Sequence, residues 1–235
     1  MSTPTPNPSD EDTRAAAFIS RFARQLSPPD LPELQLWLAD EVTPLWEATS
    51  AVLAHKDVEP PYWAFAWPGG IALARYLLDK PHLVAGRSVL DLAAGSGLVG
   101  LAAAKAGARS VLLADTDPTA VVAIQLNAIA NHCSVDATSE DLLGAKPPDV
   151  EVVVAGDVCY EQPMAGRVLA FLNAAAAQGA TVLLADPGRQ YLPSNGLRSL
   201  ATLQVQTSRN IESTDLKTVT VWELRTSKEP GLPRQ

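Results

Sequence analysis

The chain has little of what would place it in several other classes of protein. Cysteine occurs only twice in 235 residues, at Cys133 and Cys159, and this spacing matches neither a zinc site nor a disulfide framework. No apolar run reaches the roughly 18 residues that a membrane-spanning helix needs. The first residues also lack the basic start and the apolar stretch of a signal peptide. We therefore expect a protein of the cytoplasm.

Positive charge is scarce as well. Lys and Arg number 18 against 26 Asp and Glu, which gives a formal net charge of -8. A chain with this charge repels phosphate backbones, so we expect no nucleic acid among its partners. The charge fits a small-molecule substrate or a protein that presents a cationic group, although an acidic surface also serves solubility alone.

Apolar residues, in contrast, make up 47% of the chain, which is enough for a globular core. From residue 69 onward the pattern predicts helices at residues 71–78, 98–106, 117–131 and 164–177. It predicts strands at residues 88–92, 110–114, 150–155, 181–185, 201–207 and 216–224. Unbroken apolar strands between helices favour a parallel sheet with helices on both faces. A short turn before the last strand favours antiparallel pairing of the last two strands.

The residues before this region predict an extension made of helices. Residues 13–26 carry apolar side chains about one turn apart. A second helix is expected at residues 30–39, which begin with a capping acid and a proline in the first turn. A third, short helix is expected to open at Thr43-Pro44. Residues 1–12 are rich in Pro, Ser, Thr and acidic groups, so we expect a disordered tail there.

The most informative segment reads VLDLAAGSGLVG, from Val89 to Gly100. Asp91 stands at the end of a predicted strand, and small residues with Gly95 and Gly97 lead into the next helix. Glycines at such a place let the backbone approach a ligand closely. Asp115 ends the second predicted strand, 20 residues past Gly95. A carboxylate at that distance can hold both ribose hydroxyls of a nucleoside.

Two kinds of nucleoside ligand compete for this loop. A dinucleotide would bring its pyrophosphate close to Asp91, which would repel it, and the spacing D-x-A-x-G-x-G differs from G-x-G-x-x-G. S-adenosylmethionine (SAM) has no phosphate and carries a positive sulfonium and an amino group. An acidic loop therefore favours SAM, and a tight turn that binds nothing is the remaining alternative.

Acidic residues recur at the ends of the predicted strands. Asp91, Asp115, Asp157 and Asp186 all fall at such ends. In an open α/β sheet, ligands bind beyond the carboxyl ends of the strands. We therefore expect the four acids to converge on one rim, around a cofactor that is cationic.

Longer motifs resemble those of one family. The runs LPELQLWLADEVTPLW, PPYWAFAWPGGIALARYLLD, GDVCYE and DPGRQYLP are similar to those of the seven-β-strand, class I, SAM-dependent protein lysine methyltransferases. The resemblance covers roughly residues 30 to 224. The chain departs from the wider class I pattern at Ala93, where a glycine is commoner. Within the family the motifs look most like those of the bacterial branch that acts on the electron transfer flavoprotein β subunit.

The resemblance implies a fold, an activity and a partner. The fold would be α/β and Rossmann-like, with a mostly parallel seven-stranded sheet, an antiparallel C-terminal strand, helices on both faces and an N-terminal helical extension. The activity would be transfer of methyl groups from SAM to lysine side chains of a protein substrate, with S-adenosylhomocysteine as the product and without a metal. The implied substrate is the electron transfer flavoprotein β subunit, and a ribosomal protein is a second candidate.

Composition and residue pattern divide the chain into four parts. Residues 1–12 and 227–235 would be a disordered N-terminal tail and a flexible C-terminal tail. Residues 13–68 would form the helical extension together with a loop that covers the cofactor. Residues 69–226 would form the SAM-binding methyltransferase domain.

The resemblance also implies roles for single residues. The family pattern Asp/Glu-x-x-Tyr/Phe after the fourth strand falls on Asp157 and Tyr160, the catalytic candidates. The cofactor-binding candidates are Trp67, Asp91, Ala93, Gly95, Gly97, Asp115, Thr116, Asp141 and Asp157. Asp115 would bind the ribose, and Asp141 would lie near the adenine unless it is only a loop acid or a helix cap.

The chemistry of lysine methylation agrees with this assignment. A free lysine has a pKa near about 10.4 and is mostly an unreactive ammonium. Asp157 could accept hydrogen bonds from the amine and aim its lone pair at the methyl group, while Trp67 and Tyr160 could line the cofactor or lysine wall and favour cationic amines. Arg189 and Tyr191 are candidates for substrate binding, although Arg189 could instead order its loop or form a surface salt bridge.

Other interpretations remain open at this point. A small-molecule N-methyltransferase of the nicotinamide type would need a deep, closed pocket, whereas a protein substrate favours a shallow acidic groove. A SAM-binding partner module without catalysis is also compatible with the fold. Adjacent His132 and Cys133 do not predict a nucleophile pair, because neighbours in a helix do not face each other.

Overall fold

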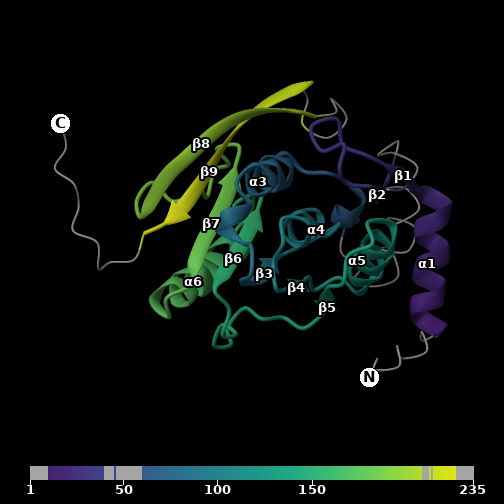
Figure 1. Ribbon diagram of the computed structural model, residues 1–235, viewed down its shortest axis with the longest axis horizontal. Coiled ribbons are helices and arrows are strands. Elements are labelled where there is room, and N and C mark those ends of the chain that lie inside the picture. The colour runs from purple at the N-terminus through teal and green to yellow at the C-terminus, as the bar shows by residue number, and fades with distance from the viewer. Residues whose placement is uncertain (1–9, 40–44, 46–59, 208–211, 213, 226–235) are drawn as a thin grey trace.

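The computed structural model describes residues 10–39, 45, 60–207, 212 and 214–225. In this part of the chain the central feature is a seven-stranded sheet with the strand order β5-β4-β3-β6-β7-β9-β8, shown in Figure 1. The order reverses between β3 and β6, so the chain leaves the middle of the sheet twice, once toward each edge. Such a switch point opens a crevice for ligands at the carboxyl ends of the strands.

Most of the sheet is parallel, as the sequence predicted. The parallel strands are β3 (Ser88–Leu92), β4 (Ser110–Ala114), β5 (Asp136–Thr138), β6 (Val152–Gly156) and β7 (Thr181–Asp186). The strand β9 (Leu216–Leu224) lies between β7 and β8 (Leu197–Gln206) and pairs antiparallel with both. The predicted antiparallel C-terminal strand is therefore confirmed.

Alternate side chains of the central strands enter two different cores. On β6, Val152 and Val154 pack into one core, and Val153 and Ala155 pack into the other, all of them completely buried. Because successive side chains of a strand point to opposite faces, an unbroken apolar run needs cover on both sides. This cover explains why the strands read as continuous apolar segments.

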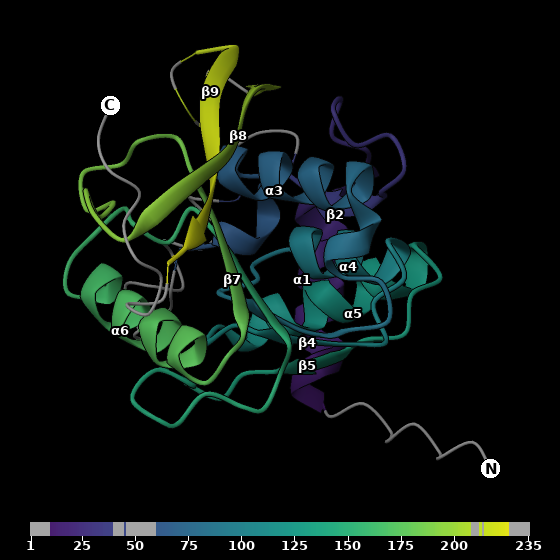
Figure 2. The same ribbon diagram turned by 60° about the vertical axis from the view of Figure 1, so that its left-hand side comes forward.

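Helices supply the cover on each face. One face carries α3 (Pro68–Asp79), α4 (Leu98–Lys105) and α5 (Pro118–Ala130), and the other carries α6 (Met164–Ala177), as Figures 1 and 2 show. Short 3-10 helices lie at Tyr62–Ala64 and Pro81–Leu83. Within the described ranges, no helix combines the length and apolar character that crossing a membrane requires.

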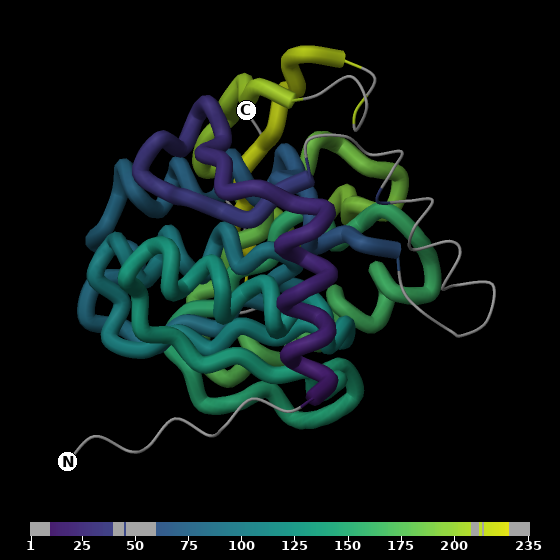
Figure 3. Tube along the Cα trace, turned by 90° about the vertical axis from the view of Figure 1, so that its right-hand side faces the viewer, coloured from purple at the N-terminus to yellow at the C-terminus, as the bar shows by residue number. Residues whose placement is uncertain are grey.

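The N-terminal extension differs from the sequence prediction. It begins with a helix, α1 (Asp10–Phe22), which packs against α5 along the outside of the molecule (Figure 3). The predicted helix continued to residue 26, but β1 (Arg24–Leu26) follows instead and pairs antiparallel with β2 (Leu36–Leu38). The helix predicted at residues 30–39 is therefore wrong.

Two asparagines, Asn127 in α5 and Asn131 directly after it, explain the strand at residues 36–38. The Asn131 side chain accepts from the Gln35 N–H at 3.0 Å and donates to the Gln35 carbonyl at 2.5 Å. Asn127 Oδ1 accepts from the Trp37 N–H at 2.7 Å. These bonds satisfy backbone groups that a helix would otherwise pair locally. Leu36 and Leu38 are buried on either side of the less buried Trp37, which is strand periodicity.

One strand was not predicted, and the remaining predictions concern a short helix and the two tails. The strand β5 was not predicted from the sequence, because its three residues, one exposed and two half-buried, show no apolar pattern. Thr43 and Pro44, where a short helix was expected to open, lie outside the described residues, and so do the C-terminal tail and most of the N-terminal tail. Residues 10–12 of the expected N-terminal tail belong to α1.

Asn127 makes a stability prediction, because it is completely buried and its Nδ2 also donates to the Ser96 carbonyl at 2.8 Å. We expect Asn127→Ala to lower the free energy of unfolding by about 2–3 kcal/mol, since two backbone groups lose their buried partner. Urea denaturation measures the change. Gln125→Ala, at an exposed position of the same helix, should change it by less than about 0.5 kcal/mol. Equal effects of the two substitutions would contradict the role given to Asn127.

Candidate active site

A cavity of about 600 Å³ lies at the carboxyl edge of the parallel strands, within the size range of small-molecule sites. Its walls come from the loops after β3, β4, β5 and β6 and from the residues before α3. Of the site residues predicted from the sequence, the cavity is lined by Trp67, Asp91, Ala93, Gly95, Asp115, Thr116, Asp141, Asp157, Tyr160 and Arg189. Gly97 and Tyr191 are not part of this lining.

Asp91, in β3, is almost fully buried at 1% exposure. Its Oδ2 accepts a hydrogen bond from the Gly100 N–H at 2.7 Å. Burial raises the pKa of Asp91 to about 7, the nearby charge of Asp115 adds to the rise, and the Gly100 N–H opposes it. A cation bound beside this carboxyl would stabilise its ionised form.

Asp115 organises the glycine loop from the end of β4. Its Oδ2 accepts from the Gly95 N–H at 2.8 Å, and its Oδ1 accepts from the Asp117 N–H at 3.0 Å. Asp117 in turn caps α5 by accepting from the Thr119 N–H at 2.7 Å. Because each carboxylate oxygen has two lone pairs, Asp115 can still accept hydrogen bonds from a ligand.

The backbone conformation at Ala93 explains why a glycine is commoner at this position in the class I pattern. Ala93 has a φ of 56°, in the left-handed region, where glycine is unstrained and alanine is not. Gly97, with a φ of 77°, starts α4 instead of facing the cavity. A Cβ at Gly97 would lie 3.0 Å from Leu113 Cδ2 and 3.1 Å from an Ile124 carbon, so the position is required by packing.

Asp157 follows β6 and faces the first turn of α3. Its Oδ2 accepts from the Gly70 N–H at 3.0 Å, and its Oδ1 lies 3.1 Å from Arg189 Nη2. A Cβ at Gly69 would come within 2.5 Å of Asp157 Oδ2, so only glycine lets the helix approach this closely. The sequence drew attention to Trp67-Pro-Gly-Gly, but the contact of its glycines with Asp157 was missed.

The surroundings of Asp157 act on its charge in opposite directions. Burial raises the pKa of Asp157 to about 6 and Asp186 adds to the rise, while the Arg189 cation and the Gly70 N–H lower it. Above that pH the carboxylate is the main form. A buried carboxylate next to a cavity can accept hydrogen bonds from an amine.

Aromatic rings form one wall of the cavity. Trp67 Nε1 donates to the Tyr62 carbonyl at 3.0 Å, and the Trp67 ring contacts Tyr62 and Phe65 edge-on, with centroids 5.9 Å and 6.1 Å away. Tyr160, whose hydroxyl donates to Met164 Sδ at 3.4 Å, lies 5.7 Å from Tyr62. Tyr62 therefore joins the two predicted aromatics, a role that sequence reasoning missed.

Asp141 also lines the cavity. Its Oδ1 accepts from the Leu143 N–H at 2.9 Å, and its Oδ2 pairs with Arg167 at 2.6 Å. The Arg167 hydrogen bond lowers the pKa of Asp141. Asp141 is thus both an acid that orders its own loop and a residue of the cavity wall.

Arg189 does not form a surface salt bridge. Its Nη2 contacts Asp157 and also Glu212 Oε1 at 2.6 Å, and both carboxylates are largely buried. The sequence contained no signal for Glu212, which stands far from every motif. Tyr191 lies outside the cavity lining, and its N–H donates to the Cys159 carbonyl at 3.3 Å.

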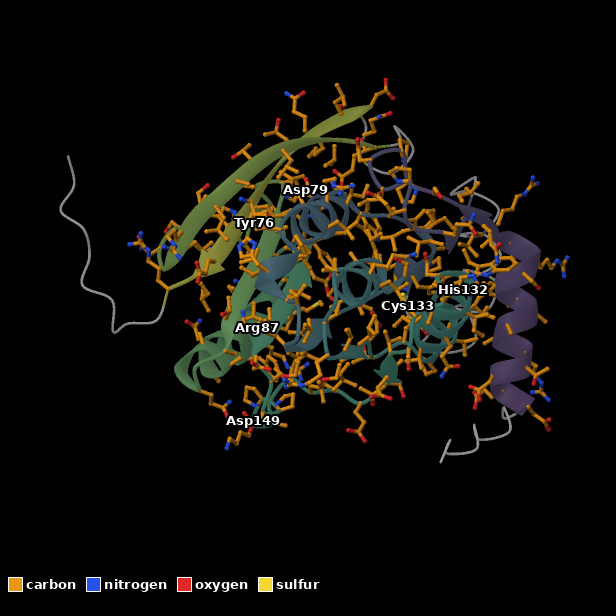
Figure 4. All side chains as sticks on the ribbon, in the orientation of Figure 1. Tyr76, Asp79, Arg87, His132, Cys133 and Asp149 are labelled. Atoms are coloured by element: carbon orange, nitrogen blue, oxygen red, sulfur yellow. The ribbon has the colours of Figure 1, made fainter. Side chains whose placement is uncertain are left out.

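The cysteines offer no activated thiol. Figure 4 places His132 and Cys133 together just after α5, and neither lines the cavity. Burial raises the pKa of Cys133, and burial with the charges of Asp186 and Asp157 raises the pKa of Cys159 to about 12. In the part of the chain that the structure describes, no group of three or more His, Cys, Asp or Glu residues could hold a metal ion.

Comparison with known proteins identifies the family. A family model described as lysine methyltransferase matches residues 55–200. The electron transfer flavoprotein beta subunit lysine methyltransferase of Xenopus laevis is 35% identical over 212 residues, which cover 88% of this chain and 85% of that relative. The Homo sapiens protein of the same name is 34% identical over 218 residues, with 90% and 82% covered.

A solved structure agrees with the fold. A proposed RNA methyltransferase from Pyrococcus horikoshii superposes with a TM-score of 0.54 at 15% identity, covering 77% of this chain and 97% of that one. At this identity the likeness concerns the fold alone. Family model, relatives and the cavity with Asp157 and Tyr160 lead to one conclusion: the chain belongs to the family of SAM-dependent lysine methyltransferases.

Proposed function

We propose that this protein methylates lysine side chains of the electron transfer flavoprotein β subunit and uses SAM as the methyl donor. The substrate follows from the names of the relatives, which match most of the chain. The observation that carries the chemistry is the meeting of Asp91, Asp115 and Asp157 in one cavity. Asp91 lies near the end of β3 and Asp115 directly follows β4. Asp157 follows β6 and lies beside the aromatic wall of the cavity.

The residues present fit SAM. Asp91 is a buried carboxyl whose pKa is raised by burial and by Asp115, and no cation of the described residues offsets that rise. A ligand with a sulfonium and an ammonium group would supply the missing charge, and Asp115 would accept from the ribose hydroxyls. Gly95, Thr116 and Asp141 complete the lining toward the nucleoside end. When bound, SAM supplies a methyl group attached to a positively charged sulfur.

Asp157 would position the lysine. Its buried carboxylate accepts a hydrogen bond from the lysine nitrogen and turns the nitrogen lone pair toward the cofactor, which lowers the entropic cost of an in-line approach. Before transfer the ammonium has to release a proton to solvent water, since the protonated nitrogen has no lone pair. Trp67, Tyr62 and Tyr160 would exclude water and face the cationic methylated amine with their rings.

We extend the proposal to the division of the chain. Residues 13–68 would act as an N-terminal extension that covers the cofactor, and residues 69–226 as the catalytic domain. In support, Trp63 is buried together with Ile19 of α1 in a core that also includes α5. The same Trp63 lines the cavity, so the extension contacts both the helix layer and the site.

The activity is tested with labelled SAM and the purified electron transfer flavoprotein β subunit from cells that lack this protein. We expect label in the β subunit, and peptide mass spectrometry should locate it on lysine. An extract of the same cells, incubated in parallel, shows how selective the transfer is. Label only in small molecules would contradict a protein substrate, and label in another protein would contradict the β subunit.

Asp157→Asn tests the carboxylate. We expect the turnover number to fall by about 100-fold or more, since the neutral amide is a weaker hydrogen-bond acceptor for the lysine nitrogen than the carboxylate. Calorimetry should find SAM affinity within about threefold of wild type, because that substitution leaves the Asp91 and Asp115 loops intact. Asp149→Asn, at an exposed loop position labelled in Figure 4, serves as the control. Full turnover in Asp157→Asn would remove Asp157 from the mechanism.

Asp91→Asn tests the cationic ligand. We expect SAM affinity to drop by about 30-fold or more, because a buried charge pair is lost. Without ligand the same variant should be more stable than wild type by on the order of 2 kcal/mol at pH 8.

The pH dependence of the stability gain follows from the raised pKa of Asp91. Wild-type Asp91 has its ordinary pKa of 3.8 in the unfolded chain and a pKa of about 7 in the folded protein. Unfolding therefore releases a proton between these values, and wild-type stability falls as the pH rises through that window. The advantage of Asp91→Asn should grow from about pH 4 to about pH 7, as urea titrations at several pH values will measure. A gain that does not change with pH would refute the assignment.

A further inference from the structure

Four alternating charges lie in a row beside the cavity. Arg189 Nη2 contacts Asp157 Oδ1 at 3.1 Å and Glu212 Oε1 at 2.6 Å, and Lys217 Nζ contacts Glu212 Oε2 at 3.1 Å. The Asp157 and Glu212 side chains are only 8% and 6% exposed. Two carboxylates and two cations leave the row without net charge.

The fold assembles this row from distant parts of the chain. Asp157 follows β6, Arg189 follows β7, Lys217 lies in β9, and Glu212 stands between β8 and β9. Because β9 runs antiparallel to β7, its first residues, with Lys217, lie at the carboxyl end of β7, where Glu212 pairs with both Lys217 and Arg189. The row therefore depends on the one antiparallel insertion in the sheet.

Stability alone gives a poor reason for this row. Buried ion pairs contribute little net stability, since desolvation offsets their attraction. The arrangement is also incompletely satisfied: among the described residues, Arg189 Nε and Asp186 Oδ2 are buried without a hydrogen-bond partner. Charged groups kept at such cost beside a cavity are candidates for a functional role.

A bare carboxylate at Asp157 would serve lysine transfer badly in two ways. Burial without a cation would favour the protonated carboxyl, which accepts hydrogen bonds poorly. Once ionised, an uncompensated carboxylate would hold the incoming lysine as an ammonium and oppose loss of its proton. A resident cation reduces both effects, since it favours the ionised carboxyl and weakens its field at the lysine.

We propose that Arg189 is the resident counter-ion of Asp157, anchored by Glu212, so that the incoming lysine meets a compensated carboxylate instead of a bare one. This inference rests on the proposed function. Arg189 acts through Asp157 and is a positioning residue. Glu212 balances its charge, and Lys217 balances that of Glu212.

Other groups around Asp157 do not take over this role. From α3 the Gly70 N–H donates to Asp157, and this donor carries no formal charge. The end of β7 contributes Asp186, whose like charge acts in the opposite sense. Cys159, on the same loop as Asp157, stays a neutral thiol because burial raises its pKa to about 12. Arg189 is thus the cation in direct contact with Asp157 within the described residues.

The test is the single-turnover rate of methyl transfer to the protein substrate, measured against pH at saturating SAM and substrate. The midpoint of the rise reports proton loss from the bound lysine. Arg189→Met removes the counter-ion, so we expect the midpoint to move up by about one pH unit. Arg189→Lys keeps a cation, so its pH midpoint should lie close to that of the wild type.

Glu212→Gln should move the midpoint in the opposite direction. Its amide oxygen still accepts the hydrogen bond from Arg189, so the guanidinium stays in place while its compensating charge is lost. The extra positive charge favours the neutral lysine, and we expect the midpoint to fall by about half a pH unit. Opposite shifts from the two variants are a result that a merely structural role would not produce.

Matched controls come from a second arginine held between two carboxylates. Arg75, on the exposed side of α3, contacts Glu33 and Asp79 at 2.8 Å each. Arg75→Met and Glu33→Gln should leave the midpoint where it is. Thermal unfolding and SAM binding of every variant show whether it folds, and Arg189→Lys with Glu212→Gln keep the test valid where Arg189→Met does not fold.

A second readout needs no turnover. Infrared difference spectra of the ligand-free protein, assigned with Asp157→Asn, follow the carboxyl of Asp157, which should ionise at higher pH in Arg189→Met than in wild type. Unmoved midpoints, or shifts of one sign in Arg189→Met and Glu212→Gln, would overturn the inference. A raised KM for the protein substrate with an unmoved midpoint would assign Arg189 to a substrate carboxylate instead. Absence of protein methylation by the wild type would refute the proposed function, while the infrared titration would still decide the role of Arg189.

Discussion

A buried carboxyl group has to obtain its hydrogen-bond donors and its cation from the protein or from a ligand. This constraint governs the carboxyl edge of the sheet, where Asp91, Asp115 and Asp157 line one cavity. Asp115 obtains two backbone N–H donors from the loops that it orders. Asp157 obtains one N–H and an arginine. Asp91 obtains one N–H and, within the described residues, no cation that acts on its pKa, which is the environment that a cationic cofactor would complete.

The fold delivers these donors through close contacts between helix starts and strand ends. The first turn of α3 can reach Asp157 because Gly69 has no Cβ to collide with the carboxylate. Gly97 lets α4 start against Leu113 and Ile124 and so holds the glycine loop before α4 against the sheet. Small residues at helix starts and acids at strand ends therefore act together, because the small residues let backbone N–H groups approach the acids. Their spacing in the sequence carries the family resemblance.

The parts of the fold that the sequence predicted are those with a local cause. Apolar runs buried on both faces define β3, β6 and β7, and the capping Asp117 with Pro118 defines the start of α5. The helix predicted at residues 30–39 failed because its backbone is held by Asn127 and Asn131, about 90 positions away. The strand β5 was not predicted because its three residues, one exposed and two half-buried, carry no apolar pattern.

The sequence by itself determined the class of fold, and it predicted the glycine loop, Asp157 and Tyr160 as site residues, because each depends on residue types at short, regular spacing. Only the tertiary structure decided how Asp157 is charged, since the groups that set its charge come from the start of α3, the loop after β7 and the connection before β9. Electrostatic interactions depend on distance through space and on burial, not on separation along the chain. For this reason Glu212 and Lys217 have no signature in the sequence, although they stand beside the site.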